Sequence, residues 1–247
     1  MKKFYYDLHM HSCLSPCGDN DNTPGNIVGM CVLKELKVIA LTDHNTCKNC
    51  PAFLKHAAEY GIIAIPGMEL TTSEEVHVVC LFYTLEDAMR FDAYVEEHQL
   101  PIPNDPLKFG DQIIMNEKDE QIGTVDHLLL ASTDISFTEV YDLVHSFNGI
   151  MIPAHIDKPS DSVTSQLGFV PEGSKFTCFE IADKNNLEKM YKINPYLKEC
   201  NVINDSDAHY LWLIHEAVNE LSAEEESVAA ILDALTGKDK RINFNIS

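Results

Sequence analysis

Short apolar runs alternate along the chain with stretches in which apolar residues recur at helical spacing. A short apolar run bounded by turn residues is typical of a buried strand, and apolar positions three or four apart are typical of a helix. The runs predict strands over residues 4–9, 37–42, 61–66, 76–83, 149–154, 178–182 and 201–205. The stretches between them predict helices over 24–35, 50–60, 85–98, 137–147, 186–199 and 223–236. Strands that alternate with helices favour parallel βαβ units in an α/β fold.

Residues 100–136 interrupt this alternation. The segment begins with Pro101, Pro103 and Pro106 and continues as a sequence typical of a β-hairpin that turns at 117–120. A segment of this length is either a peripheral insertion or a lid that covers a substrate. The sequence leaves both interpretations open.

Histidine and carboxylate residues stand at the ends of most of the predicted strands. Residues i and i+2 of an extended strand share a face, so the two residues of a His-x-His or Asp-x-His motif can point to one place. Imidazole and carboxylate groups suit zinc, iron and manganese. The pattern predicts a buried centre with several metal ions at the carboxyl ends of the strands. Its motifs are His9-Met10-His11, Asp43-His44, Glu69, His77, His155 and Asp207-Ala208-His209.

The order of these motifs resembles the PHP family, named for its polymerase-associated and histidinol-phosphatase members. The resemblance rests on DLHMHS at 7–12, LTDHN at 41–45, GMEL at 67–70, EEVHVV at 74–79, IPAHID at 152–157 and NDSDAH at 204–209. It implies an α/β fold, a distorted (β/α)7 TIM-like barrel into which 100–136 is inserted as a hairpin segment. It also implies hydrolysis of a phosphate ester at two or three divalent metal ions, with zinc, iron and manganese as candidates.

The ligands of the family can be carried over to this sequence position by position. One metal would be held by His9, His11, Glu69 and Asp207, a second by Asp19, His44 and His209, and a third by His77 and His155 together with Glu69. A carboxylate can bridge two cations because it has two oxygens. The resemblance further implies that a metal-bound hydroxide attacks phosphorus, so that no side-chain nucleophile is required.

At Asp19 the sequence departs from the family. Family members often carry Ser-Asp-Gly shortly after His-x-His, whereas this chain has Ser15-Pro16-Cys17-Gly18-Asp19. Counting back four residues from Thr23 selects Asp19 and makes the loop three residues longer. Asp21 and Cys17 are competing ligands, and the alternative role of Asp19 is a solvated turn residue.

Two residues join Glu69 as candidates for the catalytic set. Asp43 directly precedes His44, where a carboxylate can orient a ligand and raise its basicity, and its alternative role is a structural cap. Lys158 follows His155 by three residues, where several relatives place a basic residue that meets substrate phosphate. Its alternative is an ordinary surface lysine in a turn.

Length and charge narrow these expectations. The 247 residues are about the size of one barrel domain, so we expect a single domain over 1–247. The formal net charge of −21 argues against long nucleic acid as a partner and leaves a small phosphorylated substrate compatible. No apolar run approaches the roughly 20 residues that span a bilayer, and strand-like sequence begins too early for a signal peptide. We therefore expect a soluble cytoplasmic protein without a membrane partner.

Four of the eight cysteines form two pairs directly after strand-end motifs. Cys13 and Cys17 are spaced C-x3-C, and Cys47 and Cys50 are spaced C-x2-C. Four such thiols can bind structural zinc or an iron–sulfur cluster. The alternative is a set of small buried thiols, which is the usual role of free cysteine.

The predicted function is hydrolysis of a small phosphate monoester, such as a nucleotide or an amino-alcohol phosphate. All nine ligand positions of the family can be filled, which favours an enzyme. Two alternatives stay open: an exonuclease on short oligonucleotides and a noncatalytic metal-binding or sensing domain. Tyr210 and Trp212, just after the last motif, either pack in the core or stack on a base.

Overall fold

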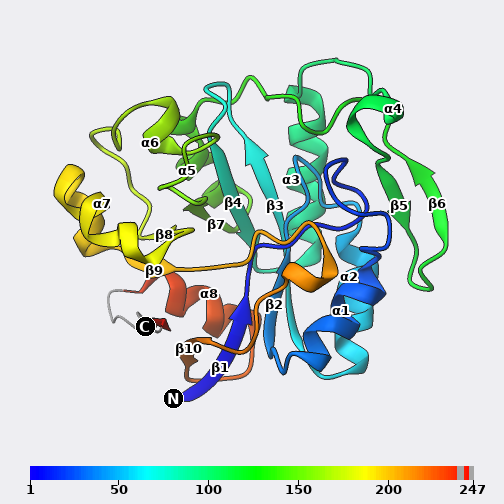
Figure 1. The fold of residues 1–247 in the computed structure, drawn as a ribbon, viewed down its shortest axis with the longest axis horizontal. Coiled ribbons are helices and arrows are strands. Elements are labelled where there is room, and N and C mark those ends of the chain that lie inside the picture. Colours follow the sequence, from blue (N-terminus) through cyan, green and yellow to red (C-terminus); the bar gives the residue numbers. More distant parts are fainter. Residues whose placement is uncertain (238–241, 245–247) are drawn as a thin grey trace.

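In the computed structural model, which describes residues 1–237 and 242–244, a curled sheet forms the centre and helices cover its outer face (Figure 1). The main sheet has the order β11-β10-β1-β2-β3-β4-β7. Its strands are β1 (Lys2–Asp7), β2 (Val38–Leu41), β3 (Ile63–Thr71), β4 (His77–Phe82), β7 (Gly149–Pro153), β10 (Asn219–Ala223) and β11 (Ile242–Phe244). The predicted single domain over 1–247 includes 238–241 and 245–247, which lie outside the described residues.

Two separate strand pairs complete the β structure, and the helices lie between the strands in sequence. The pairs are β8 (Cys178–Glu180) with β9 (Asn201–Ile203), and β5 (Ile113–Met115) with β6 (Gln121–Thr124). The longer helices are α1 (Pro24–Leu33), α2 (Cys50–Glu59), α3 (Leu85–His98), α5 (Phe137–Ser146), α7 (Leu187–Ile193) and α8 (Val228–Thr236). The short ones are α4 (Pro106–Phe109), α6 (Val163–Gln166), η1 (Lys184–Asn186), η2 (Pro195–Glu199) and η3 (Leu211–Leu213). None of the helices in the described residues is long and apolar enough to cross a membrane.

The β8–β9 pair closes the curled sheet into a distorted barrel. Just after β7, the Ile156 N–H donates to the carbonyl of Glu180 at the end of β8. On the other side, the segment after β9 returns to the segment after β1, where the His11 N–H donates to the Ala208 carbonyl at 2.9 Å. The seven strands that the sequence predicted, β1 to β4 and β7 to β9, therefore surround one interior, and the predicted barrel is confirmed.

The predicted parallel arrangement is wrong at one strand. β4 is antiparallel to both of its neighbours, with Thr71 opposite His77 at the start of the pairing with β3. A parallel pair needs a crossover connection of a dozen or more residues, and only a tight turn joins β3 to β4. As a consequence β4 begins where β3 ends, and His77 lies at the same end of the barrel as the carboxyl ends of the parallel strands.

Alternate residues of each strand face the interior and the helices. In β2, Val38 and Ala40 belong to the interior cluster, whereas Ile39 and Leu41 pack against the helices. Helix α8 fills the interior from one end with Ile231 and other apolar residues. This period of two explains why the strands are apolar throughout, since both faces are buried.

The predicted hairpin in 100–136 is confirmed, and it is fixed to the barrel. β5 and β6 turn at 116–120, where the Asn116 N–H donates to the Glu120 carbonyl at 3.0 Å. At the tip, the Asp119 carboxylate accepts from Thr23 Oγ1 at 2.6 Å and from the Gly25 N–H at 3.1 Å, which caps the first turn of α1. The hairpin is thereby held against α1.

Three further differences from the predicted elements have local causes. β3 continues to Thr71 because β4 pairs with its second half. The helix predicted over 186–199 is divided at Pro195, which cannot donate the next helical hydrogen bond. The helix predicted over 223–236 begins only at Val228, after Ser227 caps it and after β10, which pairs with β1.

Candidate metal centre

Glu69, at the mouth of the barrel, is fully buried and surrounded by imidazole rings. Its Oε1 lies 2.9 Å from His77 Nδ1, 3.1 Å from His155 Nε2 and 3.2 Å from His9 Nε2. His77 is the first residue of β4, and His155 and His9 each lie two residues after a strand, β7 and β1 respectively. One carboxylate oxygen of Glu69 thus contacts histidines from three different strand ends of the barrel.

The other oxygen of Glu69 faces a different pair of rings. Oε2 lies 3.1 Å from His44 Nδ1 and 3.3 Å from His11 Nε2. An isolated parallel bridge between His44 and Glu69 fixes the backbones of the two residues side by side. The two oxygens of one carboxylate therefore serve two different sets of histidines, which is the geometry of a bridging ligand.

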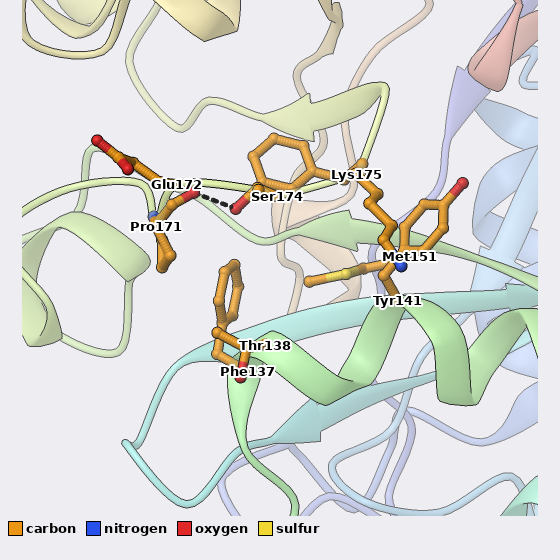
Figure 2. Close-up of a pocket in the computed structure, with 10 residues that line it drawn as sticks. Phe137, Thr138, Tyr141, Met151, Pro171, Glu172, Ser174 and Lys175 are labelled. Atoms are coloured by element: carbon orange, nitrogen blue, oxygen red, sulfur yellow. Dashed lines mark hydrogen bonds between the residues drawn. The ribbon is translucent and has the colours of Figure 1, made fainter.

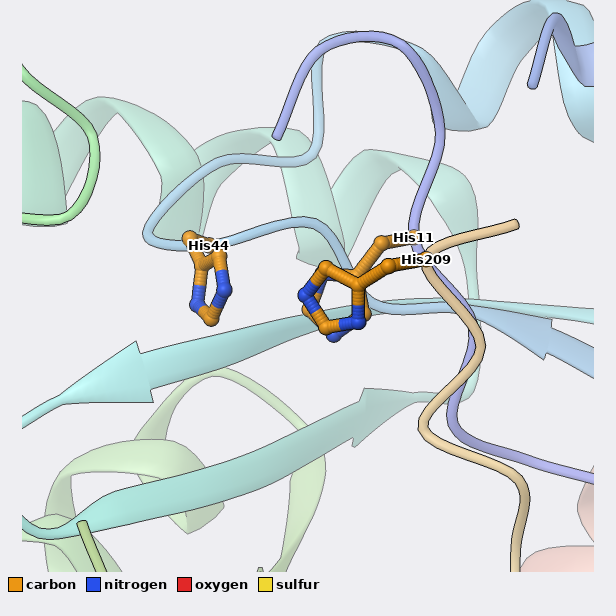
Figure 3. A group of neighbouring side chains, drawn as sticks. All are labelled: His11, His44 and His209. Atoms are coloured by element: carbon orange, nitrogen blue, oxygen red, sulfur yellow. The ribbon is translucent and has the colours of Figure 1, made fainter. Parts of the chain in front are cut away.

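Asp207 supplies the second carboxylate of the centre. Its Oδ1 lies 3.3 Å from His11 Nε2 and 3.5 Å from His9 Nε2. His209 joins the centre by stacking on His11, with ring centroids 4.1 Å apart, and His44 lies beside them (Figure 3). Three groups of donor atoms within 4.8 Å of one another result: His9, His11, Glu69 and Asp207; His11, His44 and His209; and His44, Glu69 and His77.

Two of these residues have unusual backbones. His155 has φ of 30° and Asp207 has φ of 50°, in the left-handed region that non-glycine residues seldom adopt. Each follows a strand, and the side chain of each contacts the centre. Backbone strain of this kind clusters at functional sites.

The donor atoms fit a cation better than they fit one another. Buried nitrogen and oxygen atoms of the group have no hydrogen-bond partner, although they lie close together. A buried polar atom without a partner is costly, and bound metal ions would satisfy these atoms. These atoms are His9 Nε2, His11 Nε2, His44 Nδ1, Glu69 Oε2 and Asp207 Oδ1.

The opposite nitrogens of two rings are held by other side chains. His9 Nδ1 lies 2.8 Å from Glu180 Oε2, and His11 Nδ1 lies 2.9 Å from Ser15 Oγ. Both contacts leave Nε2 turned toward Glu69. A carboxylate that accepts from one nitrogen fixes the tautomer in which the other nitrogen can bind a metal.

Charge interactions in the centre favour ionised carboxylates. Burial alone would raise the pKa of Glu69, but His77, His9 and His44 hold that pKa well below its ordinary value. Asp207 behaves in the same way, since burial opposes ionisation but His9 and His11 lower its pKa. Both carboxylates are therefore negative at neutral pH, as metal ligands must be.

The histidines divide into two kinds. Burial, reinforced by positive His11, lowers the pKa of His44 to about 3 and that of His209 to about 4. Burial also opposes protonation of His11, but the carboxylates of Asp207 and Glu69 beside its Nε2 raise its pKa to about 8. For His9, Glu180 and Glu69 outweigh burial and raise the pKa well above its ordinary value.

Asp43, a candidate for the catalytic set, lies behind His11. Its carboxylate accepts from the Ser12 N–H and Oγ, both at 2.7 Å, and from Ser15 Oγ at 2.8 Å. Ser15 Oγ is the same atom that contacts His11 Nδ1. The Asp43 carboxylate is thus linked to His11 through Ser15, and the Asp43 carbonyl accepts from the Glu69 N–H at 3.1 Å.

Lys158 reaches the centre directly. Its Nζ forms an ion pair with Asp207 Oδ2, the carboxylate oxygen that faces away from His9 and His11. Burial alone would lower the pKa of Lys158, but the negative charge of Asp207 outweighs burial and raises this pKa above its ordinary value. The ammonium group therefore stays charged. A pocket of about 350 Å³ opens over the centre, lined by His44, Glu69, His77, Leu130, His155, Lys158, Ser160, Asp161, Asp207 and His209.

Asp19 lies beside the centre but outside the three groups of donor atoms. Its N–H donates to the His209 carbonyl at 3.0 Å, and its Oδ1 accepts from the Asp21 N–H at 2.9 Å. The carboxylate of Asp19 thus closes its own turn, and His11 occupies the place beside His44 and His209. Its role as a metal ligand stays a prediction.

Sequence reasoning missed two carboxylates at this end of the barrel. Glu180, fully buried, contacts His9, and Asp161 lines the pocket and accepts from the His77 N–H through its backbone carbonyl at 2.8 Å. Glu180 is the last residue of the short strand β8, and a carboxylate at a strand end was the signal in the sequence that could have identified it. Asp161 stands in a loop, where no pattern distinguishes it.

The cysteine pairs do not join the centre or form one of their own. Cys47 Sγ and Cys50 Sγ both donate to the Gly67 carbonyl, at 3.1 and 3.5 Å. Cys13 is buried and Cys17 is exposed. Within residues 1–237 and 242–244, no cysteine belongs to a group of three candidate ligands.

A second, smaller pocket lies away from the metal centre. It has a volume of about 60 Å³ and lies between α5 and the loop at 171–176 (Figure 2). Ser174 Oγ closes this loop by donating to the Pro171 carbonyl at 2.8 Å. None of the groups of metal-type donors found among the described residues lies in it, so the metal chemistry belongs to the pocket over Glu69.

The sequence is similar to two curated proteins over part of their length. It is 33% identical over 76 residues to an uncharacterized protein of Methanocaldococcus jannaschii, which covers 28% of this chain and 44% of that protein. It is 35% identical over 81 residues to the 5′-3′ exoribonuclease Rnm of Salmonella typhimurium, which covers 31% of this chain and 27% of that protein. The matches thus span less than half of either relative.

Solved structures share the fold over nearly the whole chain. The lesion-specific endonuclease PfuEndoQ of Pyrococcus furiosus has a TM-score of 0.66 at 18% identity, over 96% of this chain and 56% of that one. A protein from Bifidobacterium adolescentis, described as a metal-dependent phosphoesterase, has a TM-score of 0.57 at 18% identity, over 83% of this chain and 87% of that one.

These similarities overturn the expectation that long nucleic acid is an unlikely partner, which is therefore wrong. Endonuclease Q has been solved in complex with a 27-mer duplex substrate with an abasic lesion at the active site. Net charge is a property of the whole chain, whereas binding at a metal centre is decided by local charge, which bound cations dominate.

The assignment to a family rests on a match that covers more of the chain than either curated relative does. The model of the PHP domain matches residues 7–174, which include the motifs around His9, His44, Glu69, His77 and His155. Together with the barrel and the cluster at its mouth, this match shows that the chain belongs to the PHP domain family of metal-dependent phosphoesterases.

Proposed function

We propose that the protein hydrolyses a small phosphate monoester at a centre of two or three divalent metal ions. The observation that carries the proposal is the carboxylate of Glu69, whose two oxygens face five histidine nitrogens at 2.9 to 3.3 Å. A pocket of about 350 Å³ above it is within the usual range for small-molecule sites.

The ligands fall into three sets that share Glu69 and His11 between them. His9, His11, Glu69 and Asp207 would hold one ion, and His44 and His209, with His11 or Asp19, a second. Glu69, His77 and His155 would hold a third. When bound, zinc, iron or manganese would supply positive charge to the phosphoryl oxygens and activate a water for attack.

Lys158 is proposed to contact the substrate phosphate from the side of the pocket. Its Nζ pairs with the outer oxygen of Asp207 and is about one-third exposed. An ammonium there can turn toward the nonbridging oxygens of a phosphate without leaving the pocket. Asp43, through Ser15, would keep His11 in the orientation that presents Nε2 to the centre.

Cleavage of a nucleic-acid end is the second candidate function. It is favoured by the similarity to the 5′-3′ exoribonuclease Rnm, which covers about a third of this chain. The two candidates differ in product, because a phosphatase releases inorganic phosphate whereas an exonuclease releases mononucleotides.

One assay separates these candidates. Protein loaded in turn with zinc, iron and manganese is incubated with AMP, with ribose 5-phosphate and with a 5′-phosphorylated oligonucleotide, and the products are resolved by chromatography. The proposal expects phosphate release from the monoesters, abolished in Glu69→Gln. Mononucleotides without phosphate release would favour the second candidate, and no turnover with any metal would favour a noncatalytic domain.

A further inference from the structure

Tyr210 and Trp212 form an exposed aromatic pair immediately after the metal centre. Their ring centroids are 4.7 Å apart with an angle of 27° between the planes, so the two rings are stacked. Trp212 is 67% exposed and Tyr210 is 36% exposed. The alternative that both residues pack in the core therefore does not hold.

The segment that carries the pair is fixed to the barrel. Between and after the two aromatic residues, Leu211 packs against the hydrophobic core and Ile214 is buried. The carbonyl of Ile214 accepts from Lys34 Nζ, and the Leu213 N–H donates to the Tyr210 carbonyl at 2.9 Å. The exposed side chain of Trp212 thus stands on a turn whose backbone is held by these contacts.

The pair lies within reach of the pocket. Tyr210 directly follows His209, which lines the pocket over the metal centre. Three residues of extended chain span at most about 10 Å, so the backbone of Trp212 cannot lie farther than this from that of His209. The Asp19 N–H, which donates to the His209 carbonyl, anchors the beginning of the segment.

We propose that Trp212, supported by Tyr210, stacks on the nucleobase of the substrate while its phosphate lies at the metal centre. This inference rests on the proposed function and makes its substrate a nucleotide or a nucleotide end. Every base has a π face, so such a platform binds bases with little regard to their identity. Lys34, which reaches the Ile214 carbonyl two residues after Trp212, is paired with Glu216 at 3.0 Å, which favours stacking of a base over contact of Lys34 with a second phosphate.

Trp212 is the single tryptophan of the chain, so its fluorescence reports on this position alone. Titration of the metal-loaded protein with AMP is expected to quench the emission, and titration with ribose 5-phosphate, which lacks the base, is expected to leave it unchanged. Equal quenching by both ligands, or none by AMP, would overturn the platform.

Kinetics of paired variants give the second test. Trp212→Leu is expected to raise KM for AMP about tenfold and leave KM for ribose 5-phosphate unchanged, whereas Trp212→Phe should keep most of the affinity. Tyr60→Leu is the matched control, since Tyr60 is 59% exposed at the end of α2 just before β3, away from the carboxyl ends of the strands, and should change neither substrate.

The outcomes distinguish this inference from the proposed function. If both substrates are hydrolysed and Trp212→Leu affects them equally or not at all, the platform is wrong and the phosphoesterase stands. If neither substrate is hydrolysed but AMP alone quenches Trp212, the proposed chemistry fails and the base-binding platform is supported.

Discussion

The histidines around Glu69 and the cysteines near the same end of the barrel differ in how their donor atoms are satisfied. In the first region, His11 Nε2 and His44 Nδ1 are buried without a hydrogen-bond partner. In the second, the thiols of Cys47 and Cys50 have a backbone carbonyl to donate to. Both regions had metal-like spacing in the sequence, but only the first has atoms that a cation would complete.

This difference shows which property identifies a metal site. An unsatisfied buried polar atom costs ~1–3 kcal/mol, so a cluster of them is retained only if something else repays the loss. Spacing alone carries no such cost and arises by chance. The following predictions test whether the cluster around Glu69 binds metal ions and whether the cysteines take no part in that binding.

Glu69→Gln should have the largest effect. The amide keeps the size of the side chain but loses the negative charge between five histidines, so we expect turnover to fall by orders of magnitude and metal content to fall with it. Elemental analysis and steady-state assays measure both, and circular dichroism checks the fold. Parental activity with parental metal content would contradict the bridging role.

Glu180→Ala should weaken metal binding about 10- to 100-fold, because His9 would lose the group that fixes its tautomer. Glu180→Gln is the matched control, since its amide oxygen can still accept from His9 Nδ1, and we expect a smaller loss. Competition with a chelator of known affinity gives the constants. Equal losses in both variants would mean that the charge of Glu180, rather than its hydrogen bond, matters.

Metal affinity should rise with pH. In the metal-free protein the pKa of His11 is about 8, so below that value a proton must leave His11 before a cation can bind. Affinity is therefore lower at pH 6 than at pH 8, and binding at pH 7 releases protons. Calorimetry in buffers with different ionisation enthalpies counts them. Binding without proton release at pH 7 would exclude His11 as a ligand.

Lys158→Ala should reduce kcat/KM about tenfold, the usual effect of a lost charged hydrogen bond. If the contact is equal in the ground and transition states, the change is in KM, and if it strengthens as the bond breaks, the change is in kcat. Both constants within about twofold of the parent would make Lys158 a surface residue that only pairs with Asp207.

Much of this arrangement was readable because it depends on local pattern. Apolar runs gave the seven barrel strands, and the resemblance of the motifs to those of the family placed Glu69 among the histidines, although Glu69 lies within β3 rather than at its end. Glu180 was missed because its contact with His9 joins residues 171 positions apart, and one carboxylate in a short strand carries no pattern of its own. The antiparallel direction of β4 follows from the tight turn between β3 and β4. The sequence predicted the strands but did not show that these two are neighbours joined by such a turn, so the direction was missed.

The cysteine variants should have the smallest effect and sharpen the comparison most. Cys17 is exposed, so Cys17→Ser should change neither metal content nor activity beyond about twofold. Cys50→Ala should lower thermal stability, because the thiol is buried, and still leave the metal content unchanged. His44→Ala, measured in parallel, should lose metal, because its Nδ1 faces Glu69. A loss of metal in either cysteine variant would mean that thiols contribute to a site, and that spacing in the sequence was a better guide than the satisfied hydrogen bonds of the folded chain.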